Sequence, residues 1–236
     1  MLVCSICGGR KFSFRKVLWP ALIAEWQLSE REAAYVDEQQ GRACDGCGAS
    51  LRIVALGDAV RRGIGADLPL QAFASTPAAA KLRVLDINGA EAISPALAGL
   101  PLYVRGDFPA VDMHALPFHD EAFDLIIHSD TLEHVERPVR ALEECRRVLA
   151  PGGCLCFTVP IIVGRLTRGR AGLAKSHHGD PSVSKDDFLV HTEFGADAWC
   201  FVMEAGFTRL AINQVSYPAA TALTAWCDAP RQVREA

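Results

Sequence analysis

Short apolar runs and one amphipathic stretch alternate along the middle of the chain. Residues 123–129 (FDLIIHS) and 154–159 (CLCFTV) have the length and composition of strands that are buried on both faces of a parallel sheet. Residues 138–150, between them, carry apolar side chains at helical spacing: Val139, Leu142, Cys145 and Leu149. Because a strand, a helix and a strand with short connections form a right-handed crossover unit, the pattern predicts an α/β layer fold.

Similar patterns predict elements on both sides of this unit. Further strands are expected at residues 82–87, 103–107 and 207–215. Helices are expected at residues 19–35, 51–62 and 196–205, and after Tyr217. Ser50 is placed to cap the second of these helices, and residues 151–153 (PGG) should end the central helix, since glycine readily adopts positive φ.

Length and charge restrict the class of protein. The chain has 236 residues, of which 50% are hydrophobic, and a net charge of -4, which suits either one larger domain or a standard domain with a small module. It contains neither an apolar run of membrane-spanning length nor a charged leader before an apolar stretch. We therefore expect a soluble, cytoplasmic protein without a membrane partner.

Two C-x-x-C pairs, each followed by a glycine, stand out among the nine cysteines: Cys4 with Cys7, and Cys44 with Cys47. In the cytosol thiols stay reduced, so this spacing predicts a tetrahedral thiolate site rather than disulfides. We expect structural Zn²⁺, because no histidine or carboxylate is placed to leave a catalytic coordination position open. Four ordinary buried or redox-active thiols are the alternative. The remaining cysteines lie in apolar contexts and are expected in the core: Cys145, Cys154, Cys156, Cys200 and Cys227.

By composition the chain divides into three parts. Residues 1–62 are expected to form a zinc-ribbon-like module with a connecting helix, which the metal would help to fold. Residues 63–80 (GIGADLPLQAFASTPAAA) are rich in Gly, Pro and Ala and are interpreted as a linker. Residues 81–236 then form the main domain.

Four motifs in the central region follow the pattern of a known family. They are D-x-x-x-L-P-F at 112–118, F-D-L-I at 123–126, L-E-H-V at 132–135 and R-V-L-x-P-G-G at 147–153. Together they resemble the class I S-adenosylmethionine-dependent methyltransferases, in particular the small-molecule branch, over roughly residues 82–215. The resemblance implies a Rossmann-like, doubly wound, mostly parallel sheet. This sheet would be shortened between its second and third strands, because Asp112 follows Asp107 almost at once.

The resemblance also implies where S-adenosylmethionine would bind. In the family the first strand ends in an acid and a glycine-rich turn, and here Asp86 is soon followed by N-G-A-E-A. The residues matched to the site are Asp86, Asn88, Gly89 and Glu91. Asn88 takes the place of the first usual glycine and alanines replace the other two. Asparagine tolerates positive φ better than most residues.

Later positions complete the cofactor site that the resemblance implies. Asp107, about twenty residues beyond the first turn, would accept hydrogen bonds from the ribose hydroxyls; a plain loop aspartate is the alternative. Asp112 would receive the adenine amino group, with the backbone of Met113 against the ring. Ser129, with Asp130 beside it, would line the methionine end.

The catalytic candidates are histidines. By resemblance, Glu133 and His134 of L-E-H-V lie near the transferred methyl group, and His134 is a candidate base because neutral imidazole is available near pH 7. The alternative is that both side chains only brace the following helix. His178, at the end of a basic stretch, and His191, near the expected substrate entrance, are further candidates.

That basic stretch, residues 161–179, contains no acid and four cations: Arg165, Arg168, Arg170 and Lys175. In a chain of negative net charge it would clamp a phosphorylated or carboxylated substrate by charge-assisted hydrogen bonds. A solvated loop is the alternative.

The motifs therefore predict an S-adenosylmethionine-dependent methyltransferase with a zinc module. Its acceptor would be a small or conjugated metabolite, and anionic and saccharide-like molecules are the candidates. A ribosomal or transfer RNA acceptor is a rival, although the net acidic chain lacks a broad basic stripe with interleaved aromatics. The atypical first turn also leaves open a non-catalytic, zinc-bearing binding protein.

Overall fold

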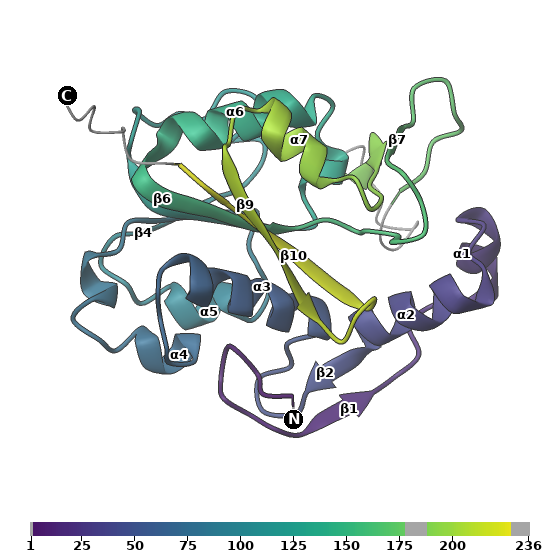
Figure 1. Ribbon diagram of the computed structural model, residues 1–236, viewed down its shortest axis with the longest axis horizontal. Coiled ribbons are helices and arrows are strands. Elements are labelled where there is room, and N and C mark those ends of the chain that lie inside the picture. The colour runs from purple at the N-terminus through teal and green to yellow at the C-terminus, as the bar shows by residue number, and fades with distance from the viewer. Residues whose placement is uncertain (1, 178–187, 228–236) are drawn as a thin grey trace, which may run out of the picture.

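A six-stranded sheet lies at the centre of the computed structural model, which describes residues 2–177 and 188–227 (Figure 1). The sheet order is β4-β3-β5-β6-β10-β9. The strands are β3 (Val84–Ile87), β4 (Tyr103–Gly106), β5 (Phe123–Ser129), β6 (Leu149–Thr158), β9 (Arg209–Val215) and β10 (Ala220–Trp226). The first four strands in this order pair in parallel, and β10 is antiparallel to both of its neighbours. The predicted α/β fold with a mostly parallel sheet is confirmed.

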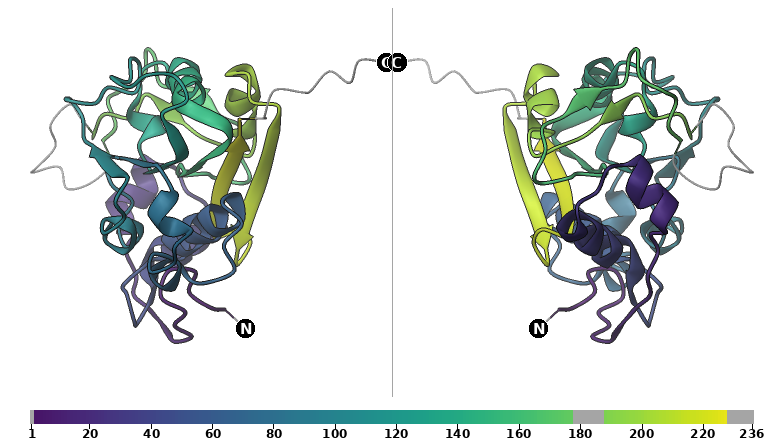
Figure 2. Two further views of the ribbon diagram at one scale, coloured as in Figure 1. Left: turned by 90° about the vertical axis from the view of Figure 1, so that its left-hand side faces the viewer. Right: turned by 90° about the vertical axis from the view of Figure 1, so that its right-hand side faces the viewer.

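Helices cover both faces of the sheet (Figures 1 and 2). One face carries α3 (Leu51–Gly63), α4 (Leu70–Phe73) and α5 (Ile93–Leu97), and the other carries α6 (Pro138–Val148) and α7 (Trp199–Glu204). Successive side chains of β5 point to opposite faces of the sheet, so both helical layers can bury apolar surface against it. Leu125 and Ile127 belong to the core under α3, whereas Ile126 belongs to the core under α6. The sheet is therefore doubly wound.

The N-terminal region holds a small hairpin-like sheet and two helices. Strands β1 (Phe12–Phe14) and β2 (Arg42–Cys44) pair antiparallel, and α1 (Pro20–Glu25) and α2 (Glu30–Gly41) lie between them in sequence. The prediction of one helix over 19–35 is wrong. Gln27 has a φ of 50° and ends the first helix, and Ser29 begins the second with a capping box to Glu32.

Helix α3 joins this region to the sheet. Ser50 caps it, as predicted, by accepting a hydrogen bond from the Ile53 N–H. The helix packs against β6, β9 and β10, and it comes close because Gly63 lacks a side chain. A Cβ at Gly63 would lie 2.7 Å from the Cys154 sulfur. The helix predicted to connect the module therefore forms part of the sheet's covering layer.

Several predicted boundaries differ from the structure. Residues 218–227 are not helical, because residues 220–226 form β10, which is buried between β6 and β9. Helix α6 ends at Val148, so residues 151–153 lie inside β6, where Gly152 has a φ of 83°. The helix predicted at residues 196–205 is shorter in the structure, where α7 covers Trp199–Glu204. The predicted linker, residues 63–80, contains α4 and most of the 3-10 helix η1 (Ala79–Lys81).

Shorter elements complete the fold. The 3-10 helix η2 (Leu132–His134) follows β5, and the two-residue strands β7 (Arg168–Gly169) and β8 (Thr192–Glu193) pair beyond β6. The connection from β4 to β5, residues 107–122, holds neither helix nor strand. Across residues 2–177 and 188–227, no helix is long and apolar enough to cross a membrane.

Candidate functional site

A cavity of about 890 Å³ opens beyond the carboxyl ends of β3, β4 and β5, and we call it the strand-end cavity. The chain leaves β3 for β4 on one side and later returns to β5 on the other side. The cavity therefore lies at a switch point of the sheet, where open α/β folds bind ligands. Seven residues predicted for the site line it: Asn88, Asp107, Asp112, Met113, Ser129, His134 and His191.

The turn after β3 is held in an unusual backbone conformation. Asn88 has a φ of 58°, Gly89 of 80° and Glu91 of 43°, so the expectation that Asn88 tolerates positive φ is confirmed. Asn88 Oδ1 accepts a hydrogen bond of 2.8 Å from the Phe108 N–H, which ties this turn to the one after β4. A Cβ at Gly89 would lie 2.6 Å from Arg105 Nη1. Glycine is therefore needed here for the arginine to lie against the turn.

Asp86 lies beneath this turn rather than in the cavity. It is fully buried and accepts hydrogen bonds from Ser94 Oγ at 2.5 Å and from the Tyr103 hydroxyl at 2.6 Å. Burial raises the pKa of the Asp86 carboxyl, and the two hydrogen bonds oppose that rise. Gly89 and Glu91 also lie outside the lining of the strand-end cavity. The structure thus places three of the predicted cofactor residues in or under the turn, not on the cavity wall.

Asp107 and Asp112, two of the four carboxylate residues that line the cavity, already have partners. Asp107 forms an ion pair with Arg105, with 2.9 Å between Oδ1 and Nε. Asp112 Oδ1 accepts a 2.8 Å hydrogen bond from the His114 N–H, which lowers the pKa of the Asp112 carboxyl. A negatively charged, acceptor-rich wall of this kind suits hydroxyl and amino donors and a cationic group.

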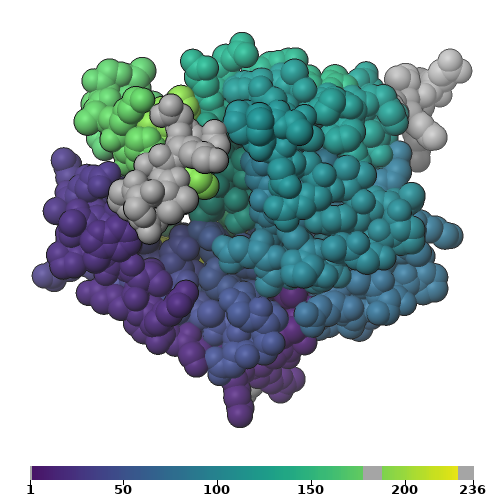
Figure 3. Space-filling model, turned by 180° about the vertical axis from the view of Figure 1, so that it is seen from behind, coloured from purple at the N-terminus to yellow at the C-terminus, as the bar shows by residue number. Residues whose placement is uncertain are grey.

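A second cavity, of about 370 Å³, adjoins the first, and we call it the inner cavity. Asp130, His134 and Phe188 line both cavities, so the two meet there. The walls of the inner cavity come from three parts of the chain, namely residues within 26–52, residues within 130–165, and Ser176 with residues within 188–194. Figure 3 shows the N-terminal region, in purple, on the same side of the molecule as the segment after β6, in green.

His134 occupies the junction between the two cavities. Its Nδ1 lies 3.1 Å from the Leu189 carbonyl oxygen. Because a carbonyl can only accept, the neutral ring carries its proton on Nδ1, and Nε2 keeps the lone pair. Nε2 lies 3.6 Å from Oε1 of the buried Glu133. His191 lines only the strand-end cavity, and His178 lies outside the described residues.

Arg52, which the sequence interpretation missed, ties α3 to this junction. It forms ion pairs with Asp130 and, at 2.6 Å, with Glu91. Burial alone would lower the pKa of its guanidinium, but these carboxylates raise it, so the group stays charged. The available signal was a lone arginine in the apolar run L-R-I-V-A-L at residues 51–56.

The three arginines of residues 161–179 pair with two carboxylates from elsewhere in the chain. Arg165 pairs with Glu32 at 2.8 Å, and Arg168 and Arg170 both pair with Glu193. Burial would raise the pKa of the Glu193 carboxyl, but the two arginines hold it below its usual value. Each of the three arginines is therefore engaged by a carboxylate, although the stretch keeps a net positive charge.

The four predicted metal ligands lie together. The sulfur atoms of Cys4, Cys7, Cys44 and Cys47 all lie within 4.8 Å of one another, with 3.6 Å between Cys4 and Cys47 and 3.5 Å between Cys7 and Cys44. A tetrahedral zinc–thiolate site has sulfur–sulfur edges of about 3.8 Å. Gly8 and Gly48, which follow the two pairs, both have positive φ. Glycine adopts this conformation readily, so the backbone can turn and direct both sulfurs of each pair toward one ion. The donor set fits a structural zinc.

Comparison with known proteins points to one enzyme class. Residues 46–157, slightly less than half of the chain, match the family described as methyltransferase domain. The chain is 35% identical over 106 residues to an uncharacterized methyltransferase of Mycobacterium marinum, covering 43% of this chain and 40% of that protein. It is 49% identical over 47 residues to malonyl-[acyl-carrier protein] O-methyltransferase of Methylococcus capsulatus, covering 20% of this chain and 17% of that protein.

The chain thus spans two fifths or less of the length of these relatives. Among solved structures, the CurJ carbon methyltransferase is similar with 15% identity and a TM-score of 0.42, covering 89% of this chain and 70% of that one. A Thermotoga maritima protein described as an S-adenosylmethionine-dependent methyltransferase has 17% identity and a TM-score of 0.39, covering 67% and 87%. The domain match and the relatives support an S-adenosylmethionine-dependent methyltransferase.

Proposed function

We propose that this protein is an S-adenosylmethionine-dependent methyltransferase acting on a small or conjugated metabolite. One observation carries the proposal: a strand-end cavity at the switch point of the sheet meets a separate inner cavity at Asp130 and His134. The first cavity suits the cofactor and the second suits the acceptor, so the reacting groups would meet at their junction. The paired arginines beyond β6 make an anionic acceptor the less favoured form and a saccharide-like acceptor the more favoured one.

The cofactor would be held by the residues of the strand-end cavity. Asp107 would take the ribose hydroxyls, Asp112 and Met113 the adenine, and Asn88 and Ser129 the methionine end. When bound, S-adenosylmethionine supplies an activated methyl group. The carboxylates along this wall suit its positive charge.

His134 is the candidate base. The hydrogen bond from Nδ1 to the Leu189 carbonyl leaves the lone pair on Nε2, which would take the proton of an acceptor hydroxyl or amine. Glu133 lies beside it and would stabilise the imidazolium that forms. The acceptor would be a small molecule rather than a nucleic acid, and the protein would act in the cytoplasm, where thiols stay reduced.

Cofactor binding gives the direct test. Titration calorimetry should detect binding of S-adenosylmethionine and of its demethylated product to the wild-type protein. Asp107→Ala should weaken it about tenfold or more, because a hydrogen bond to a charged group is lost. Asp67→Ala is the matched control, since this exposed carboxylate lines neither cavity. Absence of binding up to the millimolar range would exclude the enzyme, and unchanged affinity in Asp107→Ala would exclude the residue assignment.

We further propose that the four-cysteine cluster holds a structural Zn²⁺. Cys4, Cys44 and Ile6 share one core cluster with Leu51 and Ile53 of α3, so the metal would stabilise the packing of α3. Elemental analysis should find one zinc per chain. Chelation should lower the melting temperature by about 10 °C or more, since structural zinc contributes several kcal/mol. Cys44→Ser should lose the metal and Cys200→Ser should keep it; full zinc content in Cys44→Ser would contradict the site.

A further inference from the structure

A third and larger cavity continues from the inner cavity. This module groove, of about 1190 Å³, lies between residues 13–48 on one side and Ser50 and Glu91 on the other. Trp26, Val36 and Gln40 line both the inner cavity and the module groove. A ligand whose reactive end lies in the inner cavity can therefore extend into the groove.

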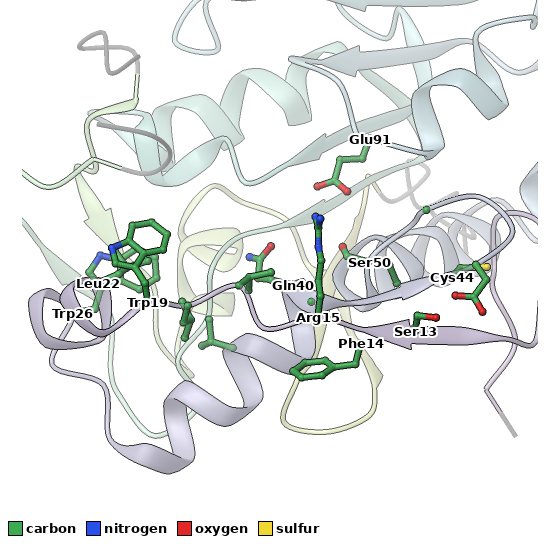
Figure 4. Close-up of a pocket in the computed structure, with 17 residues that line it drawn as sticks. Ser13, Phe14, Arg15, Trp19, Leu22, Trp26, Gln40, Cys44, Ser50 and Glu91 are labelled. Carbon is green, nitrogen blue, oxygen red and sulfur yellow. The ribbon is translucent and has the colours of Figure 1, made fainter. Parts of the chain in front are cut away.

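The lining of the groove combines two kinds of chemistry. Aromatic and aliphatic side chains form one part of it, with Trp19, Leu22 and Trp26 together at one end (Figure 4). Trp19 is 48% exposed and Phe14 is 51% exposed, so both offer apolar surface. The other part is polar, and Figure 4 shows the Arg15 guanidinium and the Glu91 carboxylate pointing toward one another from opposite sides of the groove.

This combination excludes several classes of ligand. An acyl chain would have to remove water from Arg15, Asp45 and Glu91, the charged residues of the lining, without offering them hydrogen bonds. A polyanion, including RNA, would face two carboxylates against one guanidinium. A neutral sugar fits both the apolar and the polar part of this lining, because its C–H face packs on an aromatic ring while its hydroxyls bond to carboxylate, amide and guanidinium groups.

We infer that the module groove binds the neutral saccharide part of the methyl acceptor. The reactive unit would lie in the inner cavity, where Gln39, Thr192 and Glu193 offer partners for hydroxyls, and further sugar units would stack on Trp19 and Phe14. The N-terminal module would thus select the acceptor as well as support the fold. This inference rests on the proposed methyltransferase function, although binding in the groove can be measured without turnover.

The test is a direct binding measurement on the full chain. An array of neutral glycans of one to eight units should show binding that tightens with length, because longer chains reach the groove. The best-binding oligosaccharide, followed by calorimetry, should bind roughly tenfold more weakly to Trp19→Ala and to Phe14→Ala. Trp19→Phe, which keeps a ring, should restore most of the affinity. Trp199→Ala is the matched control, because Trp199 is 43% exposed and lies on α7, outside the groove.

No glycan binding, binding independent of length, or equal affinity of Trp19→Ala and wild type would overturn the inference. So would preferential binding of dodecanoate or polyuridylate, tested as the acyl and polyanionic probes. Calorimetry with S-adenosylmethionine on the same samples separates the two proposals: cofactor binding without glycan binding rejects only the groove, and glycan binding without cofactor binding rejects only the methyltransferase.

Discussion

Replacing His134 with alanine should lower methyl transfer by about 100- to 10,000-fold, the usual contribution of a positioned general base. The loss should fall on turnover, while S-adenosylmethionine affinity changes little, since His134 is assigned to the acceptor's proton rather than to the cofactor. Turnover is measured as release of demethylated cofactor with hydroxyl- and amine-bearing acceptors. Added imidazole should partly restore it, because a free base can enter the space that the side chain leaves at the junction of the two cavities.

Two other histidines serve as comparisons for this effect. His119→Ala should behave as wild type, because His119 is exposed and lines none of the three cavities. His191→Ala should have a smaller effect than His134→Ala, since His191 lines only the strand-end cavity. A larger loss in His191→Ala, with imidazole rescue of that variant alone, would transfer the role of base to His191. Full activity of His134→Ala would show that the reaction needs no base there.

The central crossover unit could be predicted because its signals are local. Strand β5 contains the apolar run L-I-I between Asp124 and His128, and α6 repeats its apolar side chains at helical spacing. Strand β10 could not be predicted in this way. Its sequence A-T-A-L-T-A-W contains three alanines, which favour a helix, but pairing on both edges with β6 and β9 overrides that preference.

The same distinction separates the two halves of the candidate site. The strand-end cavity follows from positions just after strands, so Asn88, Asp107 and Ser129 could be placed there from the sequence. The inner cavity depends on Val36 and Gln39 of α2 and on Arg52 of α3, which only tertiary packing brings together with Asp130 and His134. No local pattern marks such residues. The ion pair from Arg165 to Glu32, which are 133 positions apart, also could not be predicted, because no local pattern brings these two residues together.

Replacing Arg52 with methionine should destabilise the fold by about 3 kcal/mol, the lower end of the cost of breaking a buried ion pair. The guanidinium side chain is 11% exposed and its partner Asp130 17% exposed, so water cannot replace the lost partner well. Glu91 is 48% exposed and should be hydrated instead. Urea unfolding measures the change as a lower midpoint with an unaltered slope.

Arg62→Met is the matched control on the same helix. Arg62 pairs with Asp58 at 2.8 Å, but its side chain is 71% exposed, so its removal should change stability by no more than about 0.5 kcal/mol. Arg52→Lys should recover only part of the loss, because one ammonium cannot hold Asp130 and Glu91 in the fixed fork that a guanidinium provides. Since Asp130 lines both the strand-end and inner cavities, the methionine variant should also bind S-adenosylmethionine more weakly under conditions where it is still folded. Equal stability of the Arg52→Met and Arg62→Met variants would show that the ion pairs of Arg52 do not hold α3 to the site.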